Sequence, residues 1–132
     1  MIEKIIQINA TIDQVWSVFA DPKITQKIGG TYVTDWKIGS SFDFTGNDGK
    51  IYTHSIIIDL IPGKLLKHEL YDLADNDKLI STISYEFTLV ENSTLLTATE
   101  ELNYEVTDQQ LADVNLGWDS ALQAVKSIAE AL

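Results

Sequence analysis

Polar side chains with catalytic potential fall where strand alternation turns them toward apolar neighbours. A histidine beside a carboxylate can act as a general base, so a convergent set would suit an enolisation or a cyclisation. Two histidines and one glutamate are also a formal ligand set for a metal ion. A serine in such a set is a poor candidate for a nucleophile. The polar residues in question are His54, His68, Ser81, Tyr85 and Glu100.

The spacing of the two histidines argues against a metal site. They are expected on adjacent strands joined by a tight turn, which pairs His54 with about Tyr71 and His68 with about Ile57. The two rings are then offset by about three residues, or roughly 10 Å along the strand. Shared metal ligation is therefore disfavoured, and neither a metal nor another cofactor is predicted.

Capping boxes predict two helices. The segment Thr11-Ile12-Asp13-Gln14 opens a short amphipathic helix over residues 12–20, which Asp21-Pro22 ends because proline disfavours a helical residue before it. One more helical turn is expected over residues 23–27. The segment Thr107-Asp108-Gln109-Gln110 opens a long amphipathic helix of roughly 24 residues, or about 36 Å.

Between residues 31 and 103 the apolar pattern has a period of two, which indicates β-strands. Asn47-Asp48-Gly49 and Pro62-Gly63 are typical of tight turns, and such short connections imply an antiparallel meander. With the segment before the first helix, the predicted strands are residues 3–9, 31–36, 41–45, 50–60, 64–71, 79–90 and 94–103. This order predicts an α+β fold in a single domain spanning residues 1–132.

Strand alternation also predicts which side chains face inward. If Asp59 faces water, the residues at even positions before it, such as Tyr52 and His54, face the core. A long helix across this inner surface can close a solid core or leave a cavity, and the polar insertions favour a cavity. A buried Glu100 then needs a hydroxyl, a histidine, water or a ligand, unless it is solvated at the open end of the sheet. The predicted ligand-binding residues are Trp36, Phe42, Phe44, Tyr52, His54, His68, Ser81, Tyr85, Phe87, Glu100, Val114 and Trp118.

Composition excludes several classes of partner. The nine basic residues are all lysines, the net charge is -11, and no basic residue lies between Lys78 and Lys126. A nucleic-acid interface needs a cationic stripe, so nucleic acid and anionic membrane surfaces are excluded as partners. Without cysteine, thiolate nucleophiles and disulfides are impossible. No apolar segment is long enough for membrane insertion and no signal peptide is visible, so a cytoplasmic location is expected.

Five motifs, in order, resemble those of the START-like (SRPBCC) superfamily, in the branch of homologues of the heat-shock chaperone ATPase activator. The resemblance implies a helix-grip fold, in which a curved seven-stranded antiparallel sheet wraps around a long C-terminal helix and an apolar pocket. One departure is that members often carry a tryptophan just after the first helix, where this chain has Gln26-Lys27-Ile28, which implies a different pocket entrance. The matching residues are Ile8-x-Ala10-x-Ile12-Asp13-x-Val15-Trp16 with Asp21-Pro22, Asp35-Trp36-Lys37-Ile38-Gly39 with Phe42-x-Phe44, Ile57-x-Asp59-Leu60-x-Pro62-x-Lys64-x-Leu66, Thr94-x-Leu96-Thr97-x-Thr99, and Gly117-Trp118-x-x-Ala121-Leu122.

The leading hypothesis is a domain that binds a hydrophobic or amphipathic small molecule, lipid-like or aromatic, without catalysis. Two alternatives stay open. One is an enzyme similar to a cyclase or aromatase that uses pocket histidines and Glu100. The other is an interaction module with a chaperone as its partner. The sequence indicates neither the identity of the ligand nor the oligomeric state.

Overall fold

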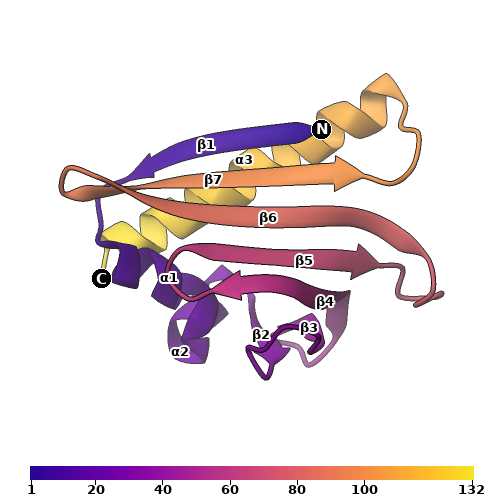
Figure 1. Cartoon of the computed structure of the whole chain (residues 1–132), viewed down its shortest axis with the longest axis horizontal. Coiled ribbons are helices and arrows are strands. Elements are labelled where there is room, and N and C mark those ends of the chain that lie inside the picture. Colours follow the sequence, from indigo (N-terminus) through magenta and orange to yellow (C-terminus); the bar gives the residue numbers. More distant parts are fainter.

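A seven-stranded antiparallel sheet forms the body of the protein, and a long helix lies across one of its faces (Figure 1). This computed structural model describes residues 1–132. The strand order is β1-β7-β6-β5-β4-β3-β2, which confirms the predicted α+β helix-grip architecture. The elements are β1 (Ile2–Ile8), α1 (Ile12–Ala20), α2 (Pro22–Thr25), the 3-10 helix η1 (Gln26–Ile28), β2 (Gly30–Thr34), β3 (Phe42–Gly46), β4 (Ile51–Ile61), β5 (Leu65–Tyr71), β6 (Leu79–Val90), β7 (Ser93–Leu102) and α3 (Asp108–Glu130).

Both predicted capping boxes are present. At α1 the Gln14 backbone N–H donates to Thr11 Oγ1 at 3.1 Å, and the Thr11 N–H donates to Gln14 Oε1 at 2.9 Å. Thr107 and Gln110 form the same pair of hydrogen bonds at α3, at the same two distances. Each box satisfies backbone donors that the first helical turn leaves free. None of the helices combines the length and the apolar character needed to span a bilayer.

The β4–β5 hairpin has the predicted turn and the predicted register. Gly63 adopts φ 73° after Pro62, the left-handed position that a type II turn requires at its second central residue. His54 lies opposite Tyr71, and His68 lies opposite Ile57. The offset between the two histidines along the hairpin is therefore as expected.

The predicted facing of β4 is wrong for the residues before Asp59. A bulge between Ile57 and Asp59 inserts one extra residue and reverses the alternation on its N-terminal side. Ser55 and Ile57 are consequently the buried residues, with exposed fractions of 1% and 0%. His54 points to the outer face, whereas Leu60, beyond the bulge, packs against the core as predicted.

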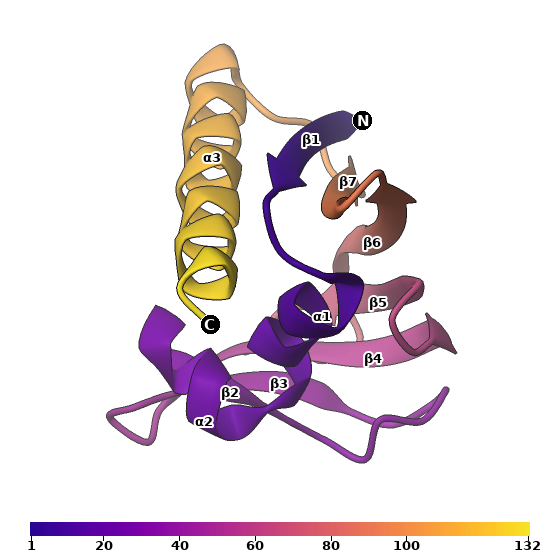
Figure 2. The same cartoon turned by 90° about the vertical axis from the view of Figure 1, so that its left-hand side faces the viewer.

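The C-terminal half of α3 is held against β1 and the segment that follows it. The Lys126 ammonium donates to the Gln7 carbonyl at 2.9 Å, and the Asn9 N–H donates to Glu130 Oε2 at 2.8 Å. Nearer the middle of α3, Asp119 pairs with Lys4 of β1 at 3.0 Å. Figure 2 shows α3 standing beside the sheet, with α1 and α2 at the end where its C-terminus lies. These contacts fix the distance between the helix and the strands, and hence the space between them.

Candidate functional site

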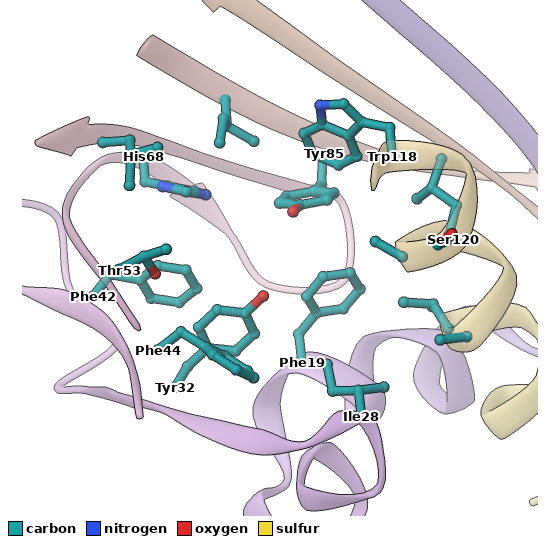
Figure 3. A pocket seen from close by; sticks show the side chains of 16 residues that line it. Phe19, Ile28, Tyr32, Phe42, Phe44, Thr53, His68, Tyr85, Trp118 and Ser120 are labelled. Atoms are coloured by element: carbon teal, nitrogen blue, oxygen red, sulfur yellow. The ribbon is translucent and has the colours of Figure 1, made fainter. Parts of the chain in front are cut away.

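A cavity of about 440 Å³ lies between the inner face of the sheet and α3 (Figure 3). Its volume is within the range of roughly 300–1,000 Å³ that small-molecule sites occupy. Most of its lining is hydrophobic, and α1, η1, five strands and α3 all contribute. The lining residues are Phe19, Ile28, Tyr32, Phe42, Phe44, Thr53, His68, Leu70, Ile83, Tyr85, Trp118, Ser120, Ala121, Leu122, Ala124 and Val125.

Aromatic rings from separate elements form a contiguous wall of the cavity. The rings of Tyr32 and Phe42 stack with centroids 4.4 Å apart, and Phe19 meets Tyr85 at 4.9 Å. Phe44 adds an edge-on contact to Tyr32 at 5.1 Å. Such pairs stabilise one another beyond their area of burial and hold each ring in one orientation. The wall therefore combines one stacked pair with rings inclined at 57° and 65°, which gives an angled apolar surface.

Two phenols add polar atoms to this wall. The hydroxyl groups of Tyr32 and Tyr85 both point into the cavity (Figure 3). Burial raises the pKa of Tyr32 to about 12, an effect that its hydrogen bond with Tyr85 partly opposes. The pKa of Tyr85 is raised well above its usual value, mainly by burial and to a smaller extent by the nearby Tyr32 hydroxyl and the Glu100 carboxylate. Both phenols are neutral at physiological pH and can each donate or accept a hydrogen bond.

His68 is a buried imidazole without a hydrogen-bond partner at Nδ1. Its side chain packs against Phe42 and Tyr85, with ring centroids 4.9 Å and 6.2 Å away, and the residue is 6% exposed. Burial lowers its pKa to about 4, so the ring is neutral at pH 7. Ser55 Oγ, on the adjacent strand and the same face, is also buried without a partner. Two unsatisfied polar atoms thus lie on the inner face of the β4–β5 pair, and of the two residues that carry them, His68 lines the cavity.

Glu100 anchors a polar cluster at the other side of Tyr85. Ser81 Oγ donates to Glu100 Oε2 at 2.7 Å, and Trp118 Nε1 donates to Oε1 at 2.9 Å. The expectation that this buried carboxylate meets a hydroxyl is confirmed. A second, shallower cavity of about 290 Å³, more open to solvent, has Glu100 in its lining and shares Tyr85, Trp118 and Ala121 with the larger cavity.

Most of the predicted ligand-binding residues are brought together here. The larger cavity is lined by Phe42, Phe44, His68, Tyr85 and Trp118. The smaller cavity is lined by Glu100, Val114, Tyr85 and Trp118, and Ser81 lies behind it as the partner of Glu100. Their role in binding stays a prediction, while their convergence is a property of the fold.

Two further predicted residues, Trp36 and Phe87, line neither cavity. Phe87 is a buried core residue, and Trp36 is partly buried and packs against the core. The rings of Trp36 and Phe87 both contact Trp16, with centroids 5.6 Å and 5.3 Å from it. The aromatic cluster around Trp16 therefore supports the site without forming its surface.

The two β4 residues in the predicted set do not reach the site. Tyr52 is 53% exposed, and its hydroxyl donates to the Asp48 carboxylate in the β3–β4 turn. His54 lies on the outer face, where Nδ1 is 2.6 Å from Asp43 Oδ1. The bulge in β4 explains the error for His54. Because His54 and His68 lie on opposite faces of the sheet, the two rings cannot bind one metal ion.

Sequence reasoning missed the small residues through which α3 faces the sheet. Ser120, Ala121 and Ala124 line the larger cavity, and their small side chains leave space that larger ones would fill. These small residues lie next to the apolar stripe of α3, and this pattern in the sequence could have predicted a space between the helix and the sheet. Tyr32 was also missed, although alternation over residues 30–34 places it with the aromatic residues of β3.

Gly117 interrupts α3 beside the smaller cavity. A Cβ atom added there would have no heavy atom within 4 Å, so no close contact requires glycine. Gly117→Ala is expected to raise the free energy of unfolding by about 1 kcal/mol, because alanine favours the helix over glycine by that amount. Urea denaturation checks this value. A loss of stability would mean that the backbone at this position needs the freedom of glycine.

The order of elements and the cavity between sheet and C-terminal helix define a helix-grip protein of the START-like type. The chain belongs to the family of activator of Hsp90 ATPase homolog 1-like proteins, whose sequence model matches residues 9–130. Both the superfamily and the branch inferred from sequence motifs are thereby confirmed. No curated protein sequence matches the chain.

Solved structures show the same fold at low sequence identity. The Aha1 dimer from Colwellia psychrerythraea is 23% identical, with a TM-score of 0.79 over 98% of this chain and 95% of that one. CalU16 from Micromonospora echinospora is 20% identical, with a TM-score of 0.76 over 96% of this chain and 74% of that one. DynU16, from the dynemicin biosynthetic locus, is 16% identical, with a TM-score of 0.80 over 98% of this chain and 46% of that one.

Proposed function

We propose that the protein binds a small apolar or amphipathic molecule in the cavity between the sheet and α3. The observation that carries this proposal is the cavity itself, an aromatic-walled space of about 440 Å³ with a few polar atoms on one side. The phenols of Tyr32 and Tyr85 can orient a hydroxyl or carbonyl group of the ligand, while the rings hold its apolar body.

The unsatisfied atoms near the cavity support the same proposal. A buried polar atom without a hydrogen bond costs about 1–3 kcal/mol, and His68 Nδ1 and Ser55 Oγ are two such atoms. His68 lines the cavity, so a polar group of a ligand that hydrogen-bonds to this imidazole would offset part of that cost.

Binding without catalysis is the form of the proposal that the geometry favours. General base catalysis by His68 requires a carboxylate or other group to orient the ring, and no residue hydrogen-bonds to its Nδ1. Glu100 is engaged by Ser81 and Trp118 rather than by a histidine. The one histidine–carboxylate pair, His54 with Asp43, lies on the opposite face of the sheet.

A variant that fills the cavity provides the test. Ala121→Phe places a large side chain at an exposed helix position that borders both cavities, so it should block the site without disturbing the core. With naphthylethanol as the probe, isothermal titration calorimetry should show at least about a tenfold loss of affinity relative to the wild type. Gln123→Phe, also exposed on α3 but outside both cavities, should bind as the wild type does.

Equal affinities for the two variants would place the probe outside the cavity and contradict the proposal.

Membership in the activator family favours a second candidate, an interaction with a chaperone. Stimulation of a chaperone ATPase by the wild type and by Ala121→Phe alike, with no binding of the probe, would favour that candidate instead.

A further inference from the structure

Glu100 is a buried carboxylate that forms no ion pair, since Lys4, on the same face of the neighbouring strand β1, pairs with Asp119 instead. Glu100 is 7% exposed and takes part in no ion pair of the protein. No lysine lines either cavity, and the chain has no arginine. A buried charge without an opposite charge is costly, and two neutral donors offset only part of that cost.

The carboxylate still has free capacity on the side that faces the smaller cavity. A carboxylate offers about four acceptor sites, and Ser81 and Trp118 each occupy one. The smaller cavity of about 290 Å³ includes Glu100 in its lining and shares Tyr85, Trp118 and Ala121 with the larger one. These three side chains form the boundary between the cavities, and an elongated ligand that crosses it would extend from the aromatic wall to the carboxylate.

The aromatic rings beside Glu100 favour the same type of group. Tyr85 and Trp118 border both cavities, and their ring centroids are 5.8 Å apart. The electron-rich faces of phenol and indole rings attract ammonium groups, indole most strongly. Trp118 presents its N–H edge to Glu100, so a cation at the carboxylate would lie beside the indole and phenol rings rather than be held by Glu100 alone.

Gly117 leaves this end of the site open. It is in the middle of α3, it lines the smaller cavity, and no atom lies within 4 Å of the position of an added Cβ. The glycine therefore provides space next to Glu100 at a cost to the helix. A large side chain at this position would extend into the smaller cavity.

We propose that the ligand carries a protonated amine, which pairs with Glu100 while its apolar body occupies the larger cavity. This inference rests on the proposed binding function and specifies the class of ligand as an amphipathic amine. The ammonium donates to the free lone pairs of the carboxylate and lies near the rings of Tyr85 and Trp118. An anionic amphiphile, such as a fatty acid, is excluded by repulsion from the same carboxylate.

Three probes that differ only in their polar end group test this inference: naphthylethylamine, naphthylethanol and naphthylacetate. Isothermal titration calorimetry at physiological ionic strength should give the amine an affinity about tenfold or more above that of the alcohol, and the acetate the lowest affinity. Glu100→Gln should abolish the preference for the amine over the alcohol, because it should lower the affinity for the amine and leave that for the alcohol unchanged. Glu101→Gln removes the same charge from an exposed neighbour on β7 and should retain the preference.

The possible outcomes separate this inference from the binding function on which it rests. If the alcohol binds and the amine has no advantage, or if Glu100→Gln and Glu101→Gln weaken the amine equally, the cavity binds ligands but Glu100 does not select them. If neither the alcohol nor the amine binds, the binding function itself fails. Ser81→Ala keeps the charge and removes one donor, so its preference for the amine should persist. That variant gives an independent result should Glu100→Gln fail to fold.

Discussion

Acidification from about pH 7.5 to below pH 4 is expected to reduce the free energy of unfolding by about 3 kcal/mol through His68 alone. Burial lowers the pKa of this imidazole from 6.5 to about 4 in the folded protein. Between these values the unfolded chain binds a proton that the folded protein does not, so stability falls as the pH falls. The groups packed against the ring are Phe42 and Tyr85, and the Tyr85 phenol stays neutral over this range.

The contribution of His68 is isolated by comparison with His68→Leu. The variant lacks the titrating group and the unsatisfied Nδ1. The free energy of unfolding, measured with urea, should therefore fall by about 3 kcal/mol less in the variant than in the wild type between these pH values. The acidic residues are the same in both proteins, so their contributions cancel in the difference between the two curves. His54→Gln changes a histidine on the outer face, so this variant should lose as much stability on acidification as the wild type does. Parallel curves for the wild type and His68→Leu would show that the imidazole is not buried.

Replacing Phe42 by alanine is expected to cost about 3–5 kcal/mol of stability, the usual range for a fully buried phenylalanine. Its ring is 1% exposed and meets Tyr32, Trp36 and His68 at centroid distances of 4.4, 5.5 and 4.9 Å. These neighbours come from three segments of the chain, so they cannot all move into the space left behind. Since typical domains are stable by only 5–15 kcal/mol, the loss is a large part of the total.

Phe44→Ala provides the matched control for that experiment. Phe44 lies on the same strand and the same face, but it is only partly buried and lines the cavity. Its replacement should cost clearly less than that of Phe42 in guanidinium denaturation, with an unchanged dependence on denaturant concentration. Similar losses for the two variants would contradict the deeper burial of Phe42 in the structure.

Local signals in the sequence were sufficient for the elements and their connections. The capping boxes at Thr11 and Thr107 place the starts of α1 and α3 because the hydrogen bonds involved are formed within four residues. The turn at Pro62-Gly63 sets the register of β4 against β5 because the turn geometry couples the two strands directly. For such features the physics is local, and a single sequence contains all of it.

The facing of side chains depends on irregularities that the sequence does not mark. The run Ile56-Ile57-Ile58 has no polar residue to show which isoleucine is the extra one, so the bulge in β4 and the outward position of His54 could not be inferred. The contribution of α3 to the cavity depends on how far the helix stands from the sheet. That distance is set by contacts such as that of Lys126 with Gln7, which join residues far apart in the chain.

The pairing of β1 with β7 has a consequence for synthesis of the chain. Ile2 lies opposite Glu100, so the first strand has no partner in the sheet until β7 has been made. The inner aromatic face stays uncovered longer still, until α3 follows. At an elongation rate of about 5–20 residues per second, that interval lasts seconds. During that interval the apolar face and the unpaired strand edges are exposed, and this is the stage of synthesis at which the chain is most prone to aggregate.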